Sequence, residues 1–155
     1  MQVDVVAVGR LRPEYRALAD LYLARLRKPW KITEHEVREA GRAGNDAVQR
    51  REEARRLREA TPAGAVVVAL TRSGAPWASS ELARRLGQWR DAGQRPAFVV
   101  GGAAGLDDSF IEACDADWSL GPLTLPHELA RVVLLEQLYR ARTILSGHPY
   151  HRARS

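Results

Sequence analysis

Two uninterrupted apolar runs, 65–70 (AVVVAL) and 97–100 (AFVV), limit the folds open to this 155-residue chain. A strand with one face in water alternates polar and apolar residues, whereas a strand buried on both faces does not alternate. Strands covered on both faces are typical of a parallel sheet that lies between two layers of helices. The two runs therefore predict the centre of such a sheet.

Helix and strand patterns alternate along the rest of the chain. Further strands are predicted at 2–8, 30–38 and 117–120, and helices at about 14–27, 46–60, 79–91, 107–115 and 127–145. Residues 71–76 are expected to form a loop, and Ser79 or Ser80 to cap the helix that follows. The alternation predicts an α/β fold with a parallel central sheet and helices on both faces. We expect one domain over 1–155, with a partly mobile basic tail at 146–155.

Cysteine usage and hydropathy exclude several classes of protein. Cys114 is the only cysteine, so the chain cannot form an intramolecular disulfide, and we expect this side chain to be buried in mid-helix. No apolar run approaches the ~20 residues of a membrane span. The first residues lack the basic start of a signal peptide. These features predict a cytoplasmic protein without a membrane partner.

The charge balance favours an acidic partner. The net charge is +5, and Lys28 and Lys31 are the only lysines, so nearly all the cations are arginines. Arginine binds phosphate through two parallel hydrogen bonds and stacks on bases. RNA or DNA is therefore the first partner to consider, although the base composition of a genome can also produce arginine-rich chains.

Ligands of parallel sheets bind at the carboxyl ends of the strands, and three loops of this chain begin there. They follow Leu70, Val100 and Leu120. The second, the glycine loop (101–105, GGAAG), allows a ligand to approach the backbone closely, but it also fits a plain turn. The third, the proline loop (120–126, LGPLTLP), is apolar yet irregular. Its side chains need either a pocket for a flat ligand such as adenine or a second subunit to cover them.

Other ligand sites have weaker support. The glycine loop does not match the dinucleotide fingerprint G-x-G-x-x-G, and the chain contains no P-loop motif. His148 and His151 lack the further ligands that a metal site needs, so no metal is predicted. The alternating pattern by itself leaves a flavodoxin-like nucleotide or flavin binder open.

Several segments taken together resemble the signature of the ribosomal RNA large subunit methyltransferase H family, a SPOUT-type family. They are 98–106 (FVVGGAAGL), 118–120 (WSL), 123–127 (LTLPH), 136–141 (EQLYRA) and 148–151 (HPYH), with support from 6–9 (VAVG) and from Gly74, Pro76 and Trp77. The resemblance extends over essentially the whole chain.

This resemblance implies an enzyme that uses S-adenosylmethionine to methylate N3 of a pseudouridine in 23S rRNA on assembled ribosomes. It also implies a homodimer with the active site at its interface and a trefoil knot in the C-terminal part. Gly102 and Gly105 would shape the glycine loop. Carried over by motif, the cofactor contacts would be Leu70, Gly101, Leu120, Gly121, Pro122, Leu123, Thr124 and Leu125.

The residues that would assist methyl transfer are less well defined. Loss of the N3 proton makes the ring a better nucleophile, so a base or a nearby cation would help. His127 lies beside the proline loop, and Arg131, Tyr139 and Arg140 follow it along the predicted helix. The tail residues are candidates for RNA contact or for a lid; they are His148, Tyr150, His151 and Arg152.

Two departures from the family pattern keep an alternative open. Ala104 stands where the glycine loop of relatives commonly carries a polar or acidic residue, and Thr71 and Arg72 stand where they often have an acid. The alternative is a non-enzymatic module that binds RNA or the ribosome and has lost the cofactor.

Overall fold

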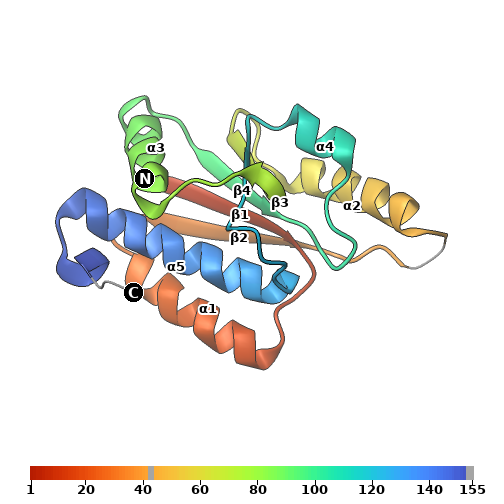
Figure 1. The fold of residues 1–155 in the computed structure, drawn as a ribbon, viewed down its shortest axis with the longest axis horizontal. Helices are drawn as coiled ribbons and strands as arrows, with labels where there is room; N and C mark the ends of the chain where they lie inside the picture. Colours follow the sequence, from red (N-terminus) through yellow and green to blue (C-terminus); the bar gives the residue numbers. More distant parts are fainter. Residues whose placement is uncertain (42–43, 153–155) are drawn as a thin grey trace.

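Parallel strands in the order β2-β1-β4-β3-β5 form the central sheet of the protein (Figure 1). The computed structural model describes residues 1–41 and 44–152. The strands are β1 (Gln2–Val8), β2 (Lys31–Val37), β3 (Val66–Ala75), β4 (Pro96–Val100) and β5 (Ala116–Trp118). The apolar runs at 65–70 and 97–100 therefore lie in neighbouring inner strands, as their lack of alternation predicts.

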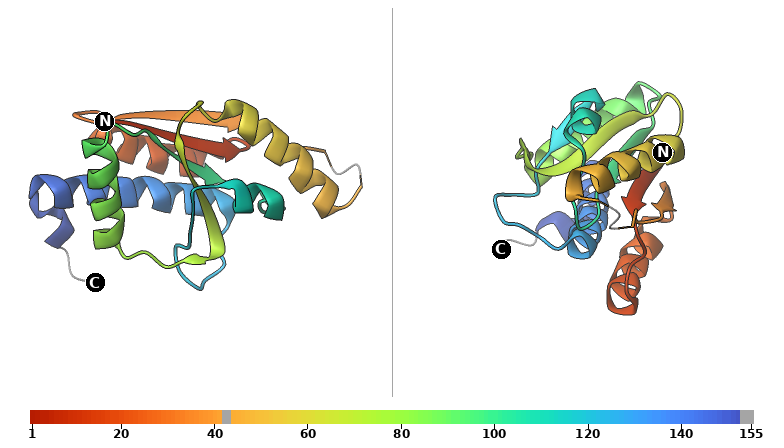
Figure 2. Two further views of the ribbon diagram at one scale, coloured as in Figure 1. Left: turned by 90° about the horizontal axis from the view of Figure 1, so that it is seen from above. Right: turned by 90° about the vertical axis from the view of Figure 1, so that its right-hand side faces the viewer.

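Helices cover both faces of this sheet, which confirms the predicted α/β architecture (Figure 2). On one face lie α1 (Pro13–Leu26), α3 (Ser79–Asp91) and α5 (His127–Ser146); on the other lie α2 (Asp46–Ala60) and α4 (Asp108–Ala113). The short 3-10 helix η1 (Pro149–Arg152) follows α5.

The pleat of the inner strands divides their side chains between two hydrophobic cores. In β1, Val3 and Val5 pack under α1, α3 and α5, whereas Val6 packs under α2 and α4. In β4, Phe98 enters the first core and Val99 the second. Both faces of a strand must be apolar when both are covered, which explains why these segments do not alternate.

The predicted loop at 71–76 is wrong, because β3 continues to Ala75. Its pairing with β5 shifts register between Leu70 and Ala75. The amide of Ser119 donates to the carbonyl of Ala75 (2.9 Å), so the chain after β5 supplies the partner that extends the strand. A Cβ at Gly74 would lie 2.7 Å from the backbone of Asp117, so this close pairing requires glycine.

Two local expectations also need correction. Cys114 does not lie in mid-helix: it is the C-cap residue that follows the last residue of α4, and it is half-buried. Burial raises the pKa of its thiol to about 11. The residue that caps α3 is Ala78, without a side-chain hydrogen bond, while the Ser79 hydroxyl donates to Gln137 of α5 (2.5 Å). Ser79 thus joins two helices instead of capping one.

The tail is more ordered than its composition predicts. Gly147 has φ +74° and ends α5, and η1 then folds back onto that helix. The ring of Tyr150 packs against Tyr139 at a centroid distance of 4.6 Å, and its hydroxyl donates to Glu136 (3.1 Å). The final residues of the tail, 153–155, lie outside the described part of the chain. Within that part, no helix is long and apolar enough to cross a membrane.

A buried carboxylate at the start of β1 makes the fold sensitive to acid. Asp4 is fully buried and accepts hydrogen bonds from Arg95 (2.8 Å) and from His35 (2.8 Å). Burial opposes ionisation, but the hydrogen bonds and charges of Arg95 and His35 outweigh it and lower the pKa of Asp4 below its ordinary value. The native state therefore favours ionised Asp4 more than the unfolded state does.

Stability is consequently expected to fall as the pH drops. A lowered native pKa gives stabilisation that is present above the unfolded pKa of about 4 and is lost as the pH falls towards the native value. Urea unfolding at pH 7, 5, 4 and 3.5 should show a free energy of unfolding that declines below about pH 5. Asp4→Asn should be less stable at pH 7 and show a shallower decline. An equally steep decline in the variant would show that other groups cause it.

Candidate active site

A pocket opens at the carboxyl edge of the sheet, where the three loops singled out from the sequence meet. The end of β3 supplies Leu70, and the glycine loop supplies Gly101 and Gly102. The proline loop supplies the remaining wall, with Leu120, Gly121, Leu123, Thr124 and Leu125. Of the cofactor contacts implied by the resemblance, only Pro122 does not line the pocket.

The glycine loop folds into a tight turn that leaves no room for side chains at its start. The amide of Gly105 donates to the carbonyl of Gly102 (3.0 Å), and Gly105 has φ +82°. A Cβ at Gly101 would lie 3.0 Å from the carbonyl carbon of Gly105, and one at Gly102 would lie 2.9 Å from Val8. The loop therefore presents bare backbone to the pocket.

Ser119 holds the proline loop against the end of β3. This residue is buried, and its hydroxyl lies 3.0 Å from the carbonyl oxygens of Arg72 and Gly121. The hydroxyl also accepts from the amide of Gly121 (3.1 Å). Gly121 has φ +130°, a conformation that side chains disfavour. The glycine and the serine together fix the entry of the loop into the pocket wall.

Arg72 joins β3 to the proline loop at the edge of the pocket. Its Nη1 donates to the Thr124 hydroxyl (2.8 Å), and both residues line the pocket. Arginine here departs from the family pattern, but the side chain bridges two loops and places a cation at the pocket. The other departure, Ala104, does not line the pocket; its carbonyl accepts from Arg50 of α2 (3.3 Å).

Several backbone amides of the pocket wall are available to a ligand. Across the described residues, no hydrogen bond uses the N–H groups of Leu120, Leu123 or Leu125. Buried backbone groups are normally paired, so unused donors in a concave apolar wall fit a ligand with acceptor atoms. These donors, the bare glycine backbone and the apolar side chains suit a ring such as adenine.

Among the catalytic candidates, only His127 lines the pocket. It begins α5, and its neighbour Glu128 accepts from both the amide (2.9 Å) and the Nε (2.8 Å) of Arg12. These hydrogen bonds and the charge of Arg12 lower the pKa of the Glu128 carboxyl, although burial opposes them. The start of α5, and with it His127, is thereby anchored to the segment after β1.

The other three candidates lie elsewhere on α5. Arg131 has a side chain that is 3% exposed and pairs with Glu34 (2.7 Å) and Glu36 (2.6 Å) of β2. Tyr139 is buried in the first core, twelve residues beyond His127, which is about 18 Å along a helix. Arg140 forms the i,i+4 pair expected with Glu136 (2.7 Å). Within one protomer, none of them reaches the pocket.

The tail lies at the end of α5 that is remote from the pocket (Figure 1). α5 has 20 residues, so its ends are about 30 Å apart. His148, Tyr150, His151 and Arg152 therefore do not form a lid over the pocket of their own protomer.

The pocket of a single protomer is small and one of its walls is exposed. Its volume is about 160 Å³, whereas ligand sites usually have ~300–1,000 Å³. Leu123 of the proline loop is 75% exposed. The sequence supports two expectations for this loop, a pocket for a flat ligand and contact with a second subunit. Both remain compatible with the structure, because the loop lines the pocket and Leu123 is still largely uncovered.

Sequence reasoning assigned no site role to six residues that shape the pocket: Thr71 and Arg72, which line it beside Leu70, and four others. Val100 and Leu106 flank the glycine loop and line the pocket with Ala130 of α5, while Ser119 supports the wall from behind. Val100 and Leu106 adjoin the glycine motif, so their positions beside Gly101 and Gly105 were an available signal. Ser119 lies in the motif 118–120, but its support of the loop, like the position of Ala130, depends on how α5 and β3 approach the loops, which local sequence does not show.

Known proteins with similar sequences point to one family. A family model described as "Predicted SPOUT methyltransferase" matches residues 1–151. A relative from Rhodospirillum centenum, named "Ribosomal RNA large subunit methyltransferase H", is 45% identical over 99% of this chain and 100% of its own length. A relative of the same name from Allorhizobium ampelinum is 44% identical, with the same shares covered.

A solved structure agrees at the level of the fold. It is that of a "probable methylase family protein" from Haemophilus influenzae Rd KW20, with a TM-score of 0.58 and 13% sequence identity. The match covers 96% of this chain and 69% of that one. Together with the relatives, it agrees with the resemblance found in the sequence motifs. The chain therefore belongs to the SPOUT methyltransferases, in the ribosomal RNA large subunit methyltransferase H family.

Proposed function

We propose that the protein transfers a methyl group from S-adenosylmethionine to N3 of a pseudouridine in 23S rRNA of assembled ribosomes. The observation that carries this proposal is the convergence of Leu70, Gly101 and the proline loop on one pocket. Family membership supports the reaction type, and the names of the relatives support the rRNA substrate. The net charge of +5 suits such a partner.

The pocket fits S-adenosylmethionine in its chemistry. The glycine loop presents bare backbone, because a Cβ at Gly101 would meet the backbone of Gly105, and the unused amides of Leu120 and Leu125 are donors for ring nitrogens. The cofactor supplies a methyl group already activated on a sulfonium. The protein must therefore mainly hold this group and the rRNA base in line, which is an effect of orientation.

Two residues of the pocket can assist the base. N3 of pseudouridine carries a proton, and His127 is a side chain in the pocket that can accept one. Arg72 places a fixed positive charge at the same pocket, and a cation stabilises the anion left when N3 loses its proton. We assign the proton acceptor to His127 and the charge stabilisation to Arg72.

The active form in this proposal is a homodimer. The pocket is small, and apolar side chains are exposed at Leu123 and, on α1, at Leu18 and Leu21, which are 46% and 44% exposed. Exposed apolar groups of this size suit a protein interface. A second copy placed antiparallel along α5 would also bring its own tail to the pocket, which the tail of the same protomer does not reach.

Sedimentation equilibrium should show a dimer, and Leu123→Glu should weaken it.

The remaining parts of the proposal follow from the family. Residues 1–155 form one domain that acts in the cytoplasm, where ribosomes are found. The C-terminal knot stays a prediction.

The non-enzymatic alternative loses its two supporting observations. Ala104 lies outside the pocket, and Arg72 bridges two pocket loops without blocking them. The backbone contacts that the glycine loop and the proline loop offer do not depend on either side chain. Membership of a methyltransferase family likewise gives no support to a flavodoxin-like flavin binder.

Two measurements test the proposal. Calorimetry with S-adenosylhomocysteine should detect binding to the purified protein. Mass mapping of 23S rRNA, after incubation of unmethylated ribosomes with protein and S-adenosylmethionine, should find one added methyl group on a pseudouridine. Absence of binding would remove the enzyme hypothesis and, if the protein still bound rRNA, would favour the RNA-binding module. Binding of the cofactor product without any methylation would contradict the proposed activity.

A further inference from the structure

The arginines of this protein differ in whether an acid neutralises them. On α2, Arg55 pairs with Glu52 (2.7 Å) and Glu59 (2.6 Å). On α3, Glu81 pairs with Arg84 (2.6 Å) and Arg85 (3.0 Å). Pairs within one helix cancel most of their own field, so these arginines contribute little to the net positive charge of the surface.

Two segments of the chain each contain four lysines or arginines and no acid. Residues 21–33 hold Arg25, Arg27, Lys28 and Lys31, and residues 137–155 hold Arg142 among other basic groups. Other long stretches without an acid, 60–80 and 92–106, contain one arginine each, so the number of cations distinguishes these two segments. Both of the lysines of the chain lie in the first segment.

The fold brings these two segments together at one end of the molecule. The guanidinium of Arg142, near the end of α5, donates to the carbonyl of Lys28, just after α1. Tyr139 lies between two cations: the guanidinium carbons of Arg25 and Arg142 are 5.6 and 5.3 Å from its ring centroid. Stacking on an aromatic ring orients a guanidinium without using its hydrogen-bond donors.

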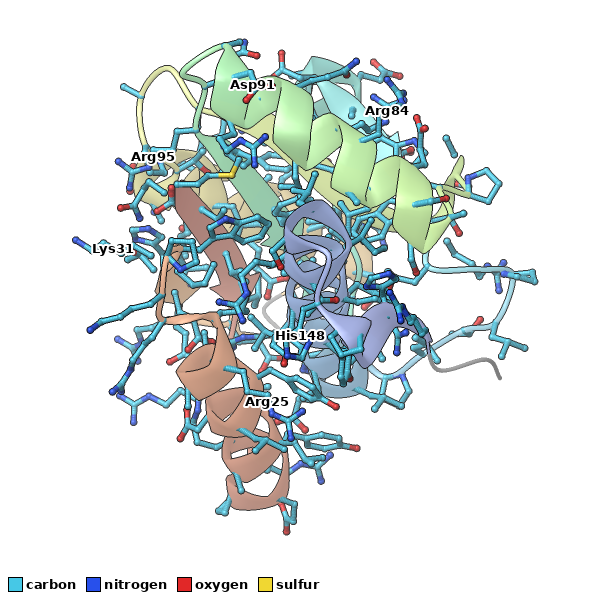
Figure 3. The ribbon with its side chains drawn as sticks, turned by 90° about the vertical axis from the view of Figure 1, so that its left-hand side faces the viewer. Arg25, Lys31, Arg84, Asp91, Arg95 and His148 are labelled. Atoms are coloured by element: carbon cyan, nitrogen blue, oxygen red, sulfur yellow. The ribbon has the colours of Figure 1, made fainter. Side chains whose placement is uncertain are left out.

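We call this group the basic platform; its members are Arg25, Arg27, Lys28, Lys31 and Arg142. Figure 3 looks onto this end of the molecule, with Arg25 and Lys31 labelled. Among the described residues, no carboxylate lies within 4.0 Å of a charged nitrogen of any member. Nearby acids are already paired, Asp20 with Arg16 and Glu136 with Arg140. All members except the half-buried Arg142 are exposed.

We propose that the basic platform binds the phosphodiester backbone of the RNA substrate, at the end of α5 opposite the pocket of the same protomer. The proposal rests on the proposed function for the identity of the partner. Guanidinium groups that are already oriented bind phosphate through two parallel hydrogen bonds, and the ammonium groups of lysines add flexible point charges. Such contacts fix the position of a protein on RNA without reading its sequence. The pocket of one protomer, with a volume of about 160 Å³, is too small to hold a length of RNA backbone.

The two lysines allow a direct test on the unmodified protein. Acylation of Lys31 blocks tryptic cleavage there, so the fully acylated protein gives peptide 28–38, whereas unmodified Lys31 gives peptides 28–31 and 32–38. No other lysine of this chain competes for an amine-specific acylating reagent. Purified 70S ribosomes should lower the acylation of both lysines several-fold. Unchanged acylation, under conditions where the protein cosediments with the ribosomes, would overturn the proposal.

A pair of matched variants tests the location of the RNA-binding surface. Lys28→Gln/Lys31→Gln removes two platform charges and keeps the Lys28 carbonyl that holds Arg142. The control, Arg55→Gln/Arg84→Gln, removes two charges that helix acids neutralise. Binding to an rRNA transcript should weaken about tenfold or more in the platform variant, and its salt slope should fall by about 1 for each phosphate that the variant no longer neutralises. The control should stay within about twofold of the wild type. Equal losses in both variants would overturn the proposal, because net charge alone would then explain them.

A third measurement separates this proposal from the proposed function. Both variants should bind S-adenosylhomocysteine as the wild type does, since none of the substituted residues lines the pocket. If the wild type binds rRNA through the platform but methylates none, the enzyme assignment fails and the platform stands. If it methylates rRNA and the platform variant binds as tightly as the wild type, the platform fails and the enzyme assignment stands.

Discussion

Gly101→Val is expected to lower the affinity for S-adenosylhomocysteine at least about 100-fold, which corresponds to about 2.7 kcal/mol. A Cβ at this position would lie 3.0 Å from the carbonyl carbon of Gly105, 3.1 Å from its oxygen and 3.1 Å from Leu106. Two of these neighbours belong to the backbone, which cannot rotate away as a side chain can. The branched side chain of valine would force the glycine loop open and displace the wall of the pocket. Isothermal titration calorimetry measures the loss.

A matched substitution in the same loop controls for general damage. Ala103 is exposed and does not line the pocket, so Ala103→Val adds volume without entering it. This control should bind S-adenosylhomocysteine within a few-fold of the wild type. Thermal melts of both variants show whether each is folded. If the two substitutions weaken binding equally, the pocket is not the cofactor site.

The sequence contains enough information to predict the layers of this fold and the edge where the site lies. The runs at 65–70 and 97–100 are apolar on both faces, and a parallel sheet is the arrangement that buries both. The carboxyl ends of parallel strands share one edge, which is why loops far apart in the chain could be expected to meet. Leu70, Gly101 and the proline loop do meet there.

Features that depend on contacts between distant segments could not be predicted in this way. β3 extends to Ala75 because Ser119, more than forty residues later, pairs with it. Residues 149–152 form η1 against α5 because Tyr150 packs on Tyr139 and donates a hydrogen bond to Glu136. In both cases the local composition, which is rich in glycine or proline, indicates a loop, and a tertiary partner overrides it.

Arg131 shows the same limit for a site residue. From the sequence it is a cation four residues after His127, so it is a reasonable catalytic candidate. The alternating pattern at 30–38 predicts an edge strand, but it does not reveal that Glu34 and Glu36 of this strand face α5. Both carboxylates point from β2 to the guanidinium of Arg131, which also donates to the carbonyl of Gly9 (3.3 Å). Arg131 therefore joins α5 to the edge strand β2 through buried ion pairs.

Arg131→Met is expected to lower the free energy of unfolding at pH 7 by about 3 kcal/mol, in the range for breaking a buried ion pair. The variant keeps most of the apolar stem but leaves Glu34 and Glu36 close together without their shared cation. Arg16 still contacts Glu34 (2.7 Å), which keeps the loss at the lower end of that range. Urea unfolding followed by circular dichroism measures the change.

The dependence of this loss on pH distinguishes a charge effect from a packing effect. Burial raises the pKa of Glu34, but hydrogen bonds from Arg16 and Arg131 outweigh it and lower the pKa below its ordinary value. Removal of Arg131 takes away part of that stabilisation of the ionised form. The difference in stability between variant and wild type should therefore be largest near pH 7 and shrink as the pH falls through about 4, where the carboxylates accept protons. A difference that stays constant from pH 7 to pH 4 would mean that lost packing, and not unpaired charge, destabilises the variant. Arg84→Met, which breaks an exposed pair on α3, should change the stability little at either pH.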